Sequence, residues 1–211
     1  MEPGGKPIVR GVVFDMDGTL LKPVIDFAEM RRRVGVHPTE GDILDVIRQR
    51  TPEDQARALA ALRDMALMPG AQELCAFLDR QGLPRGLITR NVRRSVQHFH
   101  DFLGLDPFAP AITRECEFPY KPSPAALQHI ASSWGVSPGE VLMVGDSVKD
   151  DVVSGNRAGS VSVLLDHNQP PRSPDDFPGE QRPAHVVASL SELQALLEAE
   201  YQLLPPPANG R

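Results

Sequence analysis

The amino-acid sequence predicts an α/β fold in which a doubly wound parallel sheet carries a small helical subdomain. Two observations point to the sheet: apolar runs of strand length recur along the chain, and each is followed by a stretch with helical periodicity. A third observation points to the subdomain, because the interval between Leu20 and Pro69 contains helical segments and no convincing strand. At 211 residues, the chain is long enough for one substantial core with a small appended unit.

The predicted strands are the apolar runs that end in Gly or in polar residues. They are expected at Val9–Phe14, Arg85–Thr89, Ala111–Thr113, Val141–Val144, Ser160–Leu165 and, as a short last run, His185–Val187. Helical periodicity predicts helices between them at Ala71–Gln81, Val92–Phe102, Pro124–Trp134 and Asp150–Ala158. A last helix is predicted over Ser189–Tyr201, because Ser189 and Glu192 have the spacing of a capping box.

The helical interval interrupts this alternation soon after the first strand. Its periodicity predicts helices at Ile25–Val34, Thr39–Arg50 and Pro52–Met65. We therefore expect a core formed by residues 1–20 and 68–204, with residues 21–67 as a small helical insert. The segment Asn168–Pro183 is rich in Pro and Asp, which predicts an exposed loop that packs poorly, and the Pro-rich end 205–211 is predicted to be a disordered tail.

Composition excludes several classes of function. A formal net charge of −6 argues against non-specific binding to nucleic acid. No apolar run approaches the ~20 residues of a membrane span, and the first residues lack the core of a signal peptide. We therefore expect a cytoplasmic protein, with an organellar location open if a transit peptide is missing from the sequence. Cys75 and Cys116 are expected to be free, buried thiols.

The segment Val12–Leu20 places two carboxylates at the end of a buried strand. A β-branched run ends at Asp15 and Asp17, and Gly18 follows as a residue that permits a tight turn. In a parallel sheet, functional groups gather at the carboxyl ends of the strands. Two carboxylates crowded at one point repel each other unless a proton or a cation lies between them, so this segment already implies a metal ion.

The same segment resembles the DxDGT signature of the haloacid dehalogenase-like superfamily of phosphohydrolases, and the other motifs of that family follow in its order. The segments that carry the resemblance are Asp15-Met16-Asp17-Gly18-Thr19, Pro84–Thr89, Lys121-Pro122-Ser123-Pro124 and Val141–Ser147, the last followed by Asp150, Asp151, Gly155 and Ala158-Gly159. The resemblance extends to about residue 165. It implies a Rossmann-like core and a helical cap inserted after the first strand, here shorter than in many relatives.

Phosphoryl transfer needs an in-line nucleophile, neutralised oxygens and an acid for the leaving group. Asp15 is the candidate nucleophile, through an aspartyl-phosphate, and Asp17 is the candidate general acid and base. Lys121 supplies a positive charge against the nucleophile and the transferring group. The resemblance implies a metal site formed by Asp15, the backbone carbonyl of Asp17, Asp146 and a second acid of the last motif. Hard oxygen ligands without His or Cys favour Mg²⁺.

The candidate phosphate ligands follow the second strand and the first motif. Gly18 permits backbone amides to point at a phosphate, and the resemblance places the Thr89 hydroxyl on the phosphoryl oxygens. Arg90 separates Thr89 from Asn91, whereas the family commonly has Thr-Asn, so the roles of Arg90 and Asn91 stay open.

The second acid of the last motif is either Asp150 or Asp151. Val152 follows Asp151 as an Ile follows the acid in the family, which favours Asp151. Either residue is equally compatible with a cap of the following helix.

The leading interpretation is a Mg²⁺-dependent phosphatase that acts on a small phosphomonoester. Within enzymes, the alternatives are a phosphomutase, which the short insert disfavours, and a dehalogenase, which by resemblance lacks an acid at the position of Asp17. Outside enzymes, the alternative is a binding or regulatory protein on this fold with weak or lost activity. The short insert leaves two alternatives open: the substrate is bulky, or a second subunit, in a homodimer, completes the enclosure. Sugar phosphates, phosphoglycolate, nucleotides and cofactor phosphates all remain candidate substrates.

Overall fold

A computed structural model of the chain describes residues 5–22, 51–53, 66–103 and 106–207. The chain divides into two compact units, one formed by residues 1–20 and 67–211 and the other by residues 21–66. The three helices predicted between residues 25 and 65 lie outside the described residues, apart from residues 52 and 53. The helical cap therefore stays a prediction.

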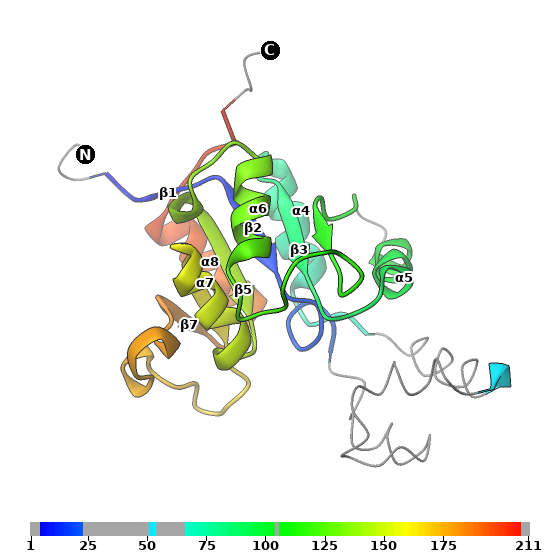
Figure 1. Ribbon diagram of the computed structural model, residues 1–211. Helices are drawn as coiled ribbons and strands as arrows, with labels where there is room; N and C mark the ends of the chain where they lie inside the picture. Colours follow the sequence, from blue (N-terminus) through cyan, green and yellow to red (C-terminus); the bar gives the residue numbers. More distant parts are fainter. Residues whose placement is uncertain (1–4, 23–50, 54–65, 104–105, 208–211) are drawn as a thin grey trace. The chain divides into compact units, whose positions relative to one another are not determined.

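A six-stranded sheet, in which every neighbouring pair is parallel, forms the centre of the larger unit as described (Figure 1). The strands in chain order are β2 (Gly11–Phe14), β3 (Arg85–Ile88), β4 (Ala111–Ile112), β5 (Val141–Gly145), β6 (Val161–Leu165) and β7 (His185–Val187). Their order across the sheet is β4-β3-β2-β5-β6-β7. Because the chain winds outward from β2 in both directions, the predicted doubly wound α/β fold is confirmed.

Helices flank the sheet on both faces, α6 and α7 on one and α4 and α8 on the other (Figure 1). The helices are α4 (Ala71–Arg80), α5 (Arg93–Leu103), α6 (Ala125–Ser133), α7 (Val153–Ala158) and α8 (Leu190–Glu200). A π-helical turn, η3 (Val148–Val152), leads directly into α7, and the short 3₁₀ helices are η2 (Pro138–Glu140), η4 (Pro174–Asp176) and η5 (Gly179–Gln181). No helix in the described part of the chain has the length and apolarity that a bilayer crossing requires.

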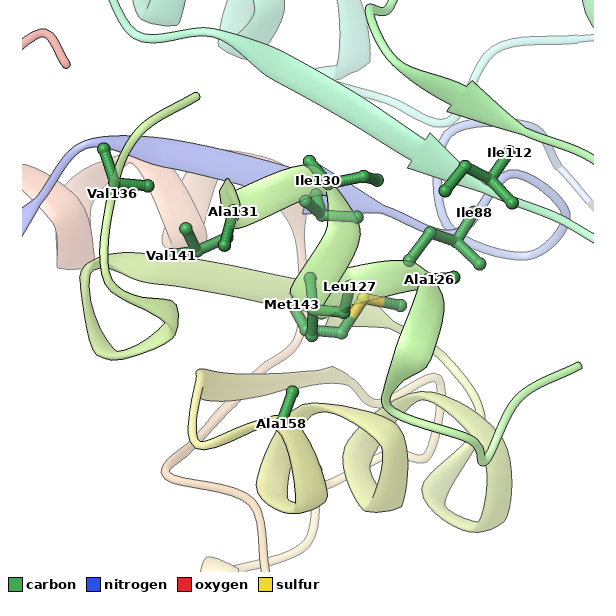
Figure 2. Packing of buried hydrophobic residues seen from close by; sticks show 11 residues of the cluster. Ile88, Ile112, Ala126, Leu127, Ile130, Ala131, Val136, Val141, Met143 and Ala158 are labelled. Carbon is green, nitrogen blue, oxygen red and sulfur yellow. The ribbon is translucent and has the colours of Figure 1, made fainter. Parts of the chain in front are cut away.

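The face of the sheet under α6 shows how the core is packed (Figure 2). Leu127 and Ile130 of α6 are fully buried and belong to one cluster with Val13 of β2 and Met143 of β5. The spacing of the two α6 residues, three apart, puts both side chains on the face that meets the sheet. The packing of α6 therefore holds β2 and β5 side by side, and these are two of the strands that end at the candidate site.

The first predicted strand is divided in two at Arg10. β1 (Ile8–Val9) pairs in parallel with β8 (Gln202–Leu203), outside the main sheet, and β2 begins at Gly11. Arg10 directs its Nε to Glu140 Oε1 at 2.8 Å and its Nη1 to the carbonyl oxygen of Pro205 at 2.7 Å. The side chain of Arg10 is half-buried by these contacts. Before Arg10 the chain pairs with β8, and after it the chain pairs with the strands of the main sheet. The predicted tail begins at Pro205, which the contact with Arg10 anchors, and residues 208–211 lie outside the described part.

The described cysteines form no disulfide: Cys75 is buried and Cys116 is half-buried. Burial raises the pKa of the Cys75 thiol to about 11, so this thiol stays protonated. Both observations agree with structural rather than chemical roles.

Candidate active site

Three neighbouring strands deliver the motif residues to one edge of the sheet. Phe14 lies opposite Leu87 of β3 and opposite Val144 of β5, so the residues that follow these positions emerge at nearly the same level. The backbone N–H of Asp15 donates to the carbonyl oxygen of Val144 at 2.9 Å, which extends the β2–β5 ladder to the nucleophile candidate itself. This register brings Asp15, Thr89 and Asp146 to the carboxyl edge, as the motif order predicts.

Lys121 reaches this edge from the connection between β4 and α6. Its Nζ lies 2.5 Å from Asp15 Oδ1, 2.6 Å from Asp151 Oδ1 and 3.1 Å from the carbonyl oxygen of Ile88, so each of its three N–H groups has an acceptor. The side chain is only 5% exposed. Burial alone would lower the pKa of Lys121, but the carboxylates of Asp15 and Asp151 raise it above its ordinary value. A charged ammonium group therefore joins the first and last motifs.

Three carboxyl groups of the site, those of Asp15, Asp17 and Asp146, have pKa values above that of an ordinary aspartate. Burial raises the pKa of Asp15 to about 7; Lys121 opposes this shift and the neighbouring Asp151 adds to it. Burial also raises the pKa values of Asp17 and Asp146. In each case the cause is the loss of water around a charged group, which a cation at this position would offset.

The acids of the first and last motifs form a cluster that suits such a cation. Asp15, Asp146 and Asp151 each place one carboxylate oxygen so that the three atoms lie within 4.8 Å of one another. The donor set consists of hard oxygens only, which suits a hard divalent cation such as Mg²⁺ better than zinc, for which His and Cys ligands are the usual ones. The Asp17 side chain is not part of the cluster, in line with the expectation that Asp17 faces a metal through its backbone carbonyl; its carboxylate accepts a hydrogen bond from Asn91 Nδ2.

The π-helical turn η3 separates the two candidate acids of the last motif. Asp151 is 1% exposed and turns inward, where its Oδ1 accepts from Lys121 and its Oδ2 accepts from the backbone N–H of Ser147 at 3.0 Å. Asp150 lies on the outer side and pairs with Arg90, whose Nη2 is 2.9 Å from Asp150 Oδ1. The cap of this turn is Ser147, whose Oγ accepts from the backbone N–H of Asp150 at 3.3 Å. The structure thus brings Asp151 into the acid cluster.

The residues after β3 show what the extra Arg90 does to the second motif. Asn91 donates from its backbone N–H to Thr89 Oγ1 at 3.1 Å and from its Nδ2 to the carboxylate of Asp17. Arg90 points to the rim of the site, where its Nη2 also donates to the carbonyl oxygen of Lys121 at 3.2 Å. Arg90 and Asn91, two of the four candidate phosphate ligands, therefore contact other residues of the motifs in this structure. The role of Thr89 toward phosphate stays a prediction.

Gly18 is required at its position for two reasons. Its φ of 81° lies in the left-handed region that favours glycine, and a Cβ atom there would overlap the carboxylate of Asp146. The carbonyl oxygen of Gly18 lies 2.7 Å from Nε2 of His167, a residue that follows β6. His167 was not predicted as a site residue, because it lies in no motif and no local signal marks it.

A family model described as haloacid dehalogenase-like hydrolase matches residues 27–159, which is more than half of the chain. The chain belongs to the haloacid dehalogenase-like hydrolase family. A haloacid dehalogenase-like hydrolase domain-containing protein of Arabidopsis thaliana is 44% identical to it, over 95% of this chain and 88% of that protein. A phosphoglycolate phosphatase of Pseudomonas savastanoi is 27% identical, over 94% of this chain and 84% of that protein.

Solved structures of haloacid dehalogenase-like hydrolases share the fold. A family hydrolase of Deinococcus radiodurans, solved with bound phosphate and sodium, has a TM-score of 0.68 at 22% identity and covers 90% of this chain and 96% of that chain. A phosphatase of this family from Thermococcus onnurineus has a TM-score of 0.65 at 22% identity, with coverage of 91% and 99%. At these identities the likeness concerns the fold alone, and it agrees with the parallel sheet described above.

In this haloacid dehalogenase-like hydrolase, Gly145 is the point where β5 makes room for Asp151. A Cβ atom at Gly145 would overlap the Asp151 side chain, which Lys121 holds from the other side. Gly145→Ala is therefore expected to displace Asp151 and to lower the free energy of unfolding by about 1–3 kcal/mol, measured by urea denaturation. Gly139→Ala is the matched control, because a Cβ there meets its nearest atom at 3.6 Å, an ordinary contact. Equal stability of the two variants would contradict the assignment.

Proposed function

We propose that this hydrolase is a Mg²⁺-dependent phosphatase that cleaves a phosphomonoester through an aspartyl-phosphate on Asp15. The observation that carries the proposal is the position of Asp15 at the carboxyl end of the central strand, where it contacts a buried ammonium and shares a carboxylate cluster. The ammonium of Lys121 holds this carboxylate in a fixed position, and the burial keeps most water away from it. Both conditions suit a carboxylate that acts as a covalent nucleophile.

Asp15 would attack phosphorus in line, so that a bond forms between its carboxylate oxygen and phosphorus while the bond to the substrate's leaving oxygen breaks. Lys121 would keep the attacking carboxylate in place by its hydrogen bond to Oδ1, and its charge would attract the phosphoryl oxygens. The Thr89 hydroxyl and the amides around Gly18 are proposed to hold the remaining phosphoryl oxygens. The alcohol then departs and Asp15 carries the phosphoryl group.

Asp17 is proposed to give a proton to the leaving oxygen and then to take one from the water that hydrolyses the aspartyl-phosphate. Two features support this role. Burial raises the pKa of Asp17, so that its carboxyl group holds a proton more readily than an exposed one. The hydrogen bond from Asn91 to its carboxylate fixes the direction in which the group points. We therefore assign Asn91 to the orientation of Asp17.

Asp15, Asp146 and Asp151, with the backbone carbonyl of Asp17, are the proposed holders of the metal ion. When bound, Mg²⁺ would reduce the repulsion between the anionic nucleophile and the anionic substrate. The carboxylate cluster supports the choice, since its donors are all hard oxygens.

Small phosphomonoesters are the proposed substrates, and phosphoglycolate is a candidate among them. Support comes from relatives: several proteins that are similar over most of this chain are named phosphoglycolate phosphatase, with identities of 25% to 31%. Selection among these substrates is proposed to come from residues 21–67, the predicted cap.

Phosphate release from a panel of phosphomonoesters, measured with Mg²⁺ and with EDTA, tests the proposal. We expect turnover of at least one small phosphomonoester with Mg²⁺, and its loss when EDTA removes the metal. Turnover that EDTA leaves unchanged would contradict the metal dependence. Absence of release from every compound would favour the alternative of a binding or regulatory protein on this fold.

A further inference from the structure

The loop after β6 is built around one buried carboxylate. Asp166 is 3% exposed and accepts hydrogen bonds from Arg172 through Nε at 3.0 Å, Nη2 at 2.9 Å and the backbone N–H at 2.8 Å. Asn168 adds two more, from Nδ2 at 2.6 Å and from its backbone N–H at 3.3 Å. The bonds from Arg172 hold the pKa of Asp166 well below its ordinary value. Residues 166–172 are therefore closed into a ring by an ionised aspartate.

Arg172 ties this ring to the core. Its guanidinium lies 4.7 Å above the centre of the Phe177 ring, and Phe177 is buried in one cluster with Val152 and Leu164. Val152 directly follows Asp151 of the acid cluster, so the loop is fixed to the element that carries that acid. Most of the segment 168–183 is exposed, as expected for a Pro- and Asp-rich loop. Within it, Ser173 and Asp176 make a capping box around the short turn η4, and Phe177 is buried.

His167 is the residue that this ring presents to the active site. Its Nε2 lies 2.7 Å from the carbonyl oxygen of Gly18. A carbonyl oxygen only accepts hydrogen bonds, so Nε2 carries the proton and donates. The imidazole does not belong to the carboxylate cluster and has no contact with Asp15 or Lys121 among those the structure describes.

The turn that His167 contacts is closed by a backbone hydrogen bond from the N–H of Leu20 to the carbonyl oxygen of Met16 at 3.0 Å, which does not involve the Gly18–Thr19 peptide itself. Gly18 has a positive φ and no Cβ, so the peptide planes on either side of it rotate at low cost. On the other side of the Gly18–Thr19 peptide, the N–H of Thr19 is 3.4 Å from the carbonyl oxygen of Met16, which is a long hydrogen bond. Of the two hydrogen bonds made by the Gly18–Thr19 peptide, the bond to His167 is the shorter. Gly18 also lies against the carboxylate of Asp146.

We propose that His167 is a positioning residue of this active site: by donating to the Gly18 carbonyl, it fixes the Asp17–Gly18–Thr19 turn against the carboxylate of Asp146. It acts through the backbone of the turn and not on the substrate. The expected effect on kcat rests on the proposed phosphatase function. The expected effect on metal affinity rests on the acid cluster alone. Since partners of metal-site groups affect both affinity and rate, both quantities should respond to its removal.

Three substitutions at position 167 distinguish the effect of the hydrogen bond from the effect of the imidazole ring itself. His167→Gln places an amide Nε2 donor close to the position of the histidine Nε2, whereas the shorter side chain of His167→Asn does not reach the Gly18 carbonyl. His167→Ala removes every donor. His129→Ala is the matched control, because His129 is an exposed histidine of α6 whose ring meets Phe118, away from the site.

Two readouts are measured on the full chain. Mn²⁺ binding is followed by electron paramagnetic resonance without substrate, and kcat and KM are measured with the best phosphomonoester of the panel. We expect His167→Ala and His167→Asn to bind Mn²⁺ about 10-fold more weakly and to lose about 10-fold in kcat, with KM within twofold. His167→Gln should recover most of both losses. Thermal unfolding of the metal-free variants should match that of His129→Ala.

The outcomes separate this inference from the proposed function. Hydrolysis by the wild type with unchanged Mn²⁺ affinity and kcat in His167→Ala would overturn the inference and leave the function standing. Absence of hydrolysis in the wild type would contradict the function, and the Mn²⁺ affinities would still decide the inference. Absence of Mn²⁺ binding in the wild type would overturn it. Losses that glutamine fails to restore, together with a lowered unfolding temperature, would show a structural role and overturn it as well.

Discussion

Replacing Asp15 by asparagine is expected to lower the rate of Mg²⁺-dependent phosphate release by about 10⁴-fold or more, because the amide lacks the carboxylate oxygen that attacks phosphorus. The fold should survive this change. Burial raises the pKa of Asp15 to about 7, so the site already disfavours a charge there, and asparagine is neutral and nearly the same shape. Lys121 keeps its bonds to Asp151 and to the carbonyl oxygen of Ile88. The measurements are the rate of phosphate release and the circular dichroism of the variant.

The control is the same change at Asp150. That carboxylate pairs with the exposed Arg90 and lies outside the acid cluster, so its loss should change the rate by less than about fivefold. Asp15→Ala guards against slow deamidation of the asparagine to aspartate, and it should be as inactive as Asp15→Asn. Retained turnover in Asp15→Ala would contradict the covalent mechanism, while a large loss in Asp150→Asn would contradict the assignment of Asp151 as the second acid.

Replacing Lys121 by methionine is expected to lower the rate by about 10²–10³-fold, because a positive charge beside the nucleophile and the phosphoryl group is removed. The change should also destabilise the metal-free protein by about 3–5 kcal/mol, since the buried carboxylates of Asp15 and Asp151 lose the ammonium between them. The rate of phosphate release and urea denaturation in EDTA measure the two effects.

Lys149→Met is the matched control, because Lys149 is exposed on η3. Lys121→Arg separates charge from shape: a guanidinium keeps the charge but does not fit a position that is 5% exposed, so it should recover little activity. Full activity of the arginine variant would show that charge alone matters at this position. Wild-type stability of Lys121→Met in EDTA would contradict the ion pairs.

The fold and the motif positions follow from the sequence because both rest on local patterns. Apolar runs with helical stretches between them predict a parallel sheet, and the strand ends then place Asp15, Thr89 and Asp146 at one edge. The choice of Asp151 over Asp150 rested on Val152, and the structure brings Asp151 into the cluster. Val152 is buried beside Leu164 and Phe177, which gives the apolar residue after the acid a physical reason.

The contacts that the sequence did not predict join residues far apart in the chain. Asn91 donates to Asp17, His167 contacts the Gly18 carbonyl, and β8 pairs with β1. No hydrophobic periodicity and no motif spacing in the sequence predicts these contacts. Arg90 appeared only as an interruption of the family pattern, and its ion pair with Asp150 is evident only from the structure. Polar contacts between residues far apart in the chain depend on the assembled backbone, so they cannot be predicted from local sequence patterns.

The central place of β2 has a consequence for how this protein is made. The strand that leads to Asp15 precedes both of its neighbours in the sheet, β3 and β5, along the chain, and β1 pairs with β8, which lies near residue 202. Contacts between such distant segments form slowly and late in folding. The apolar strand β2 is therefore without a sheet partner until β3 has been made and lacks its second neighbour until β5 has been made, a period in which chaperones are useful to a nascent chain.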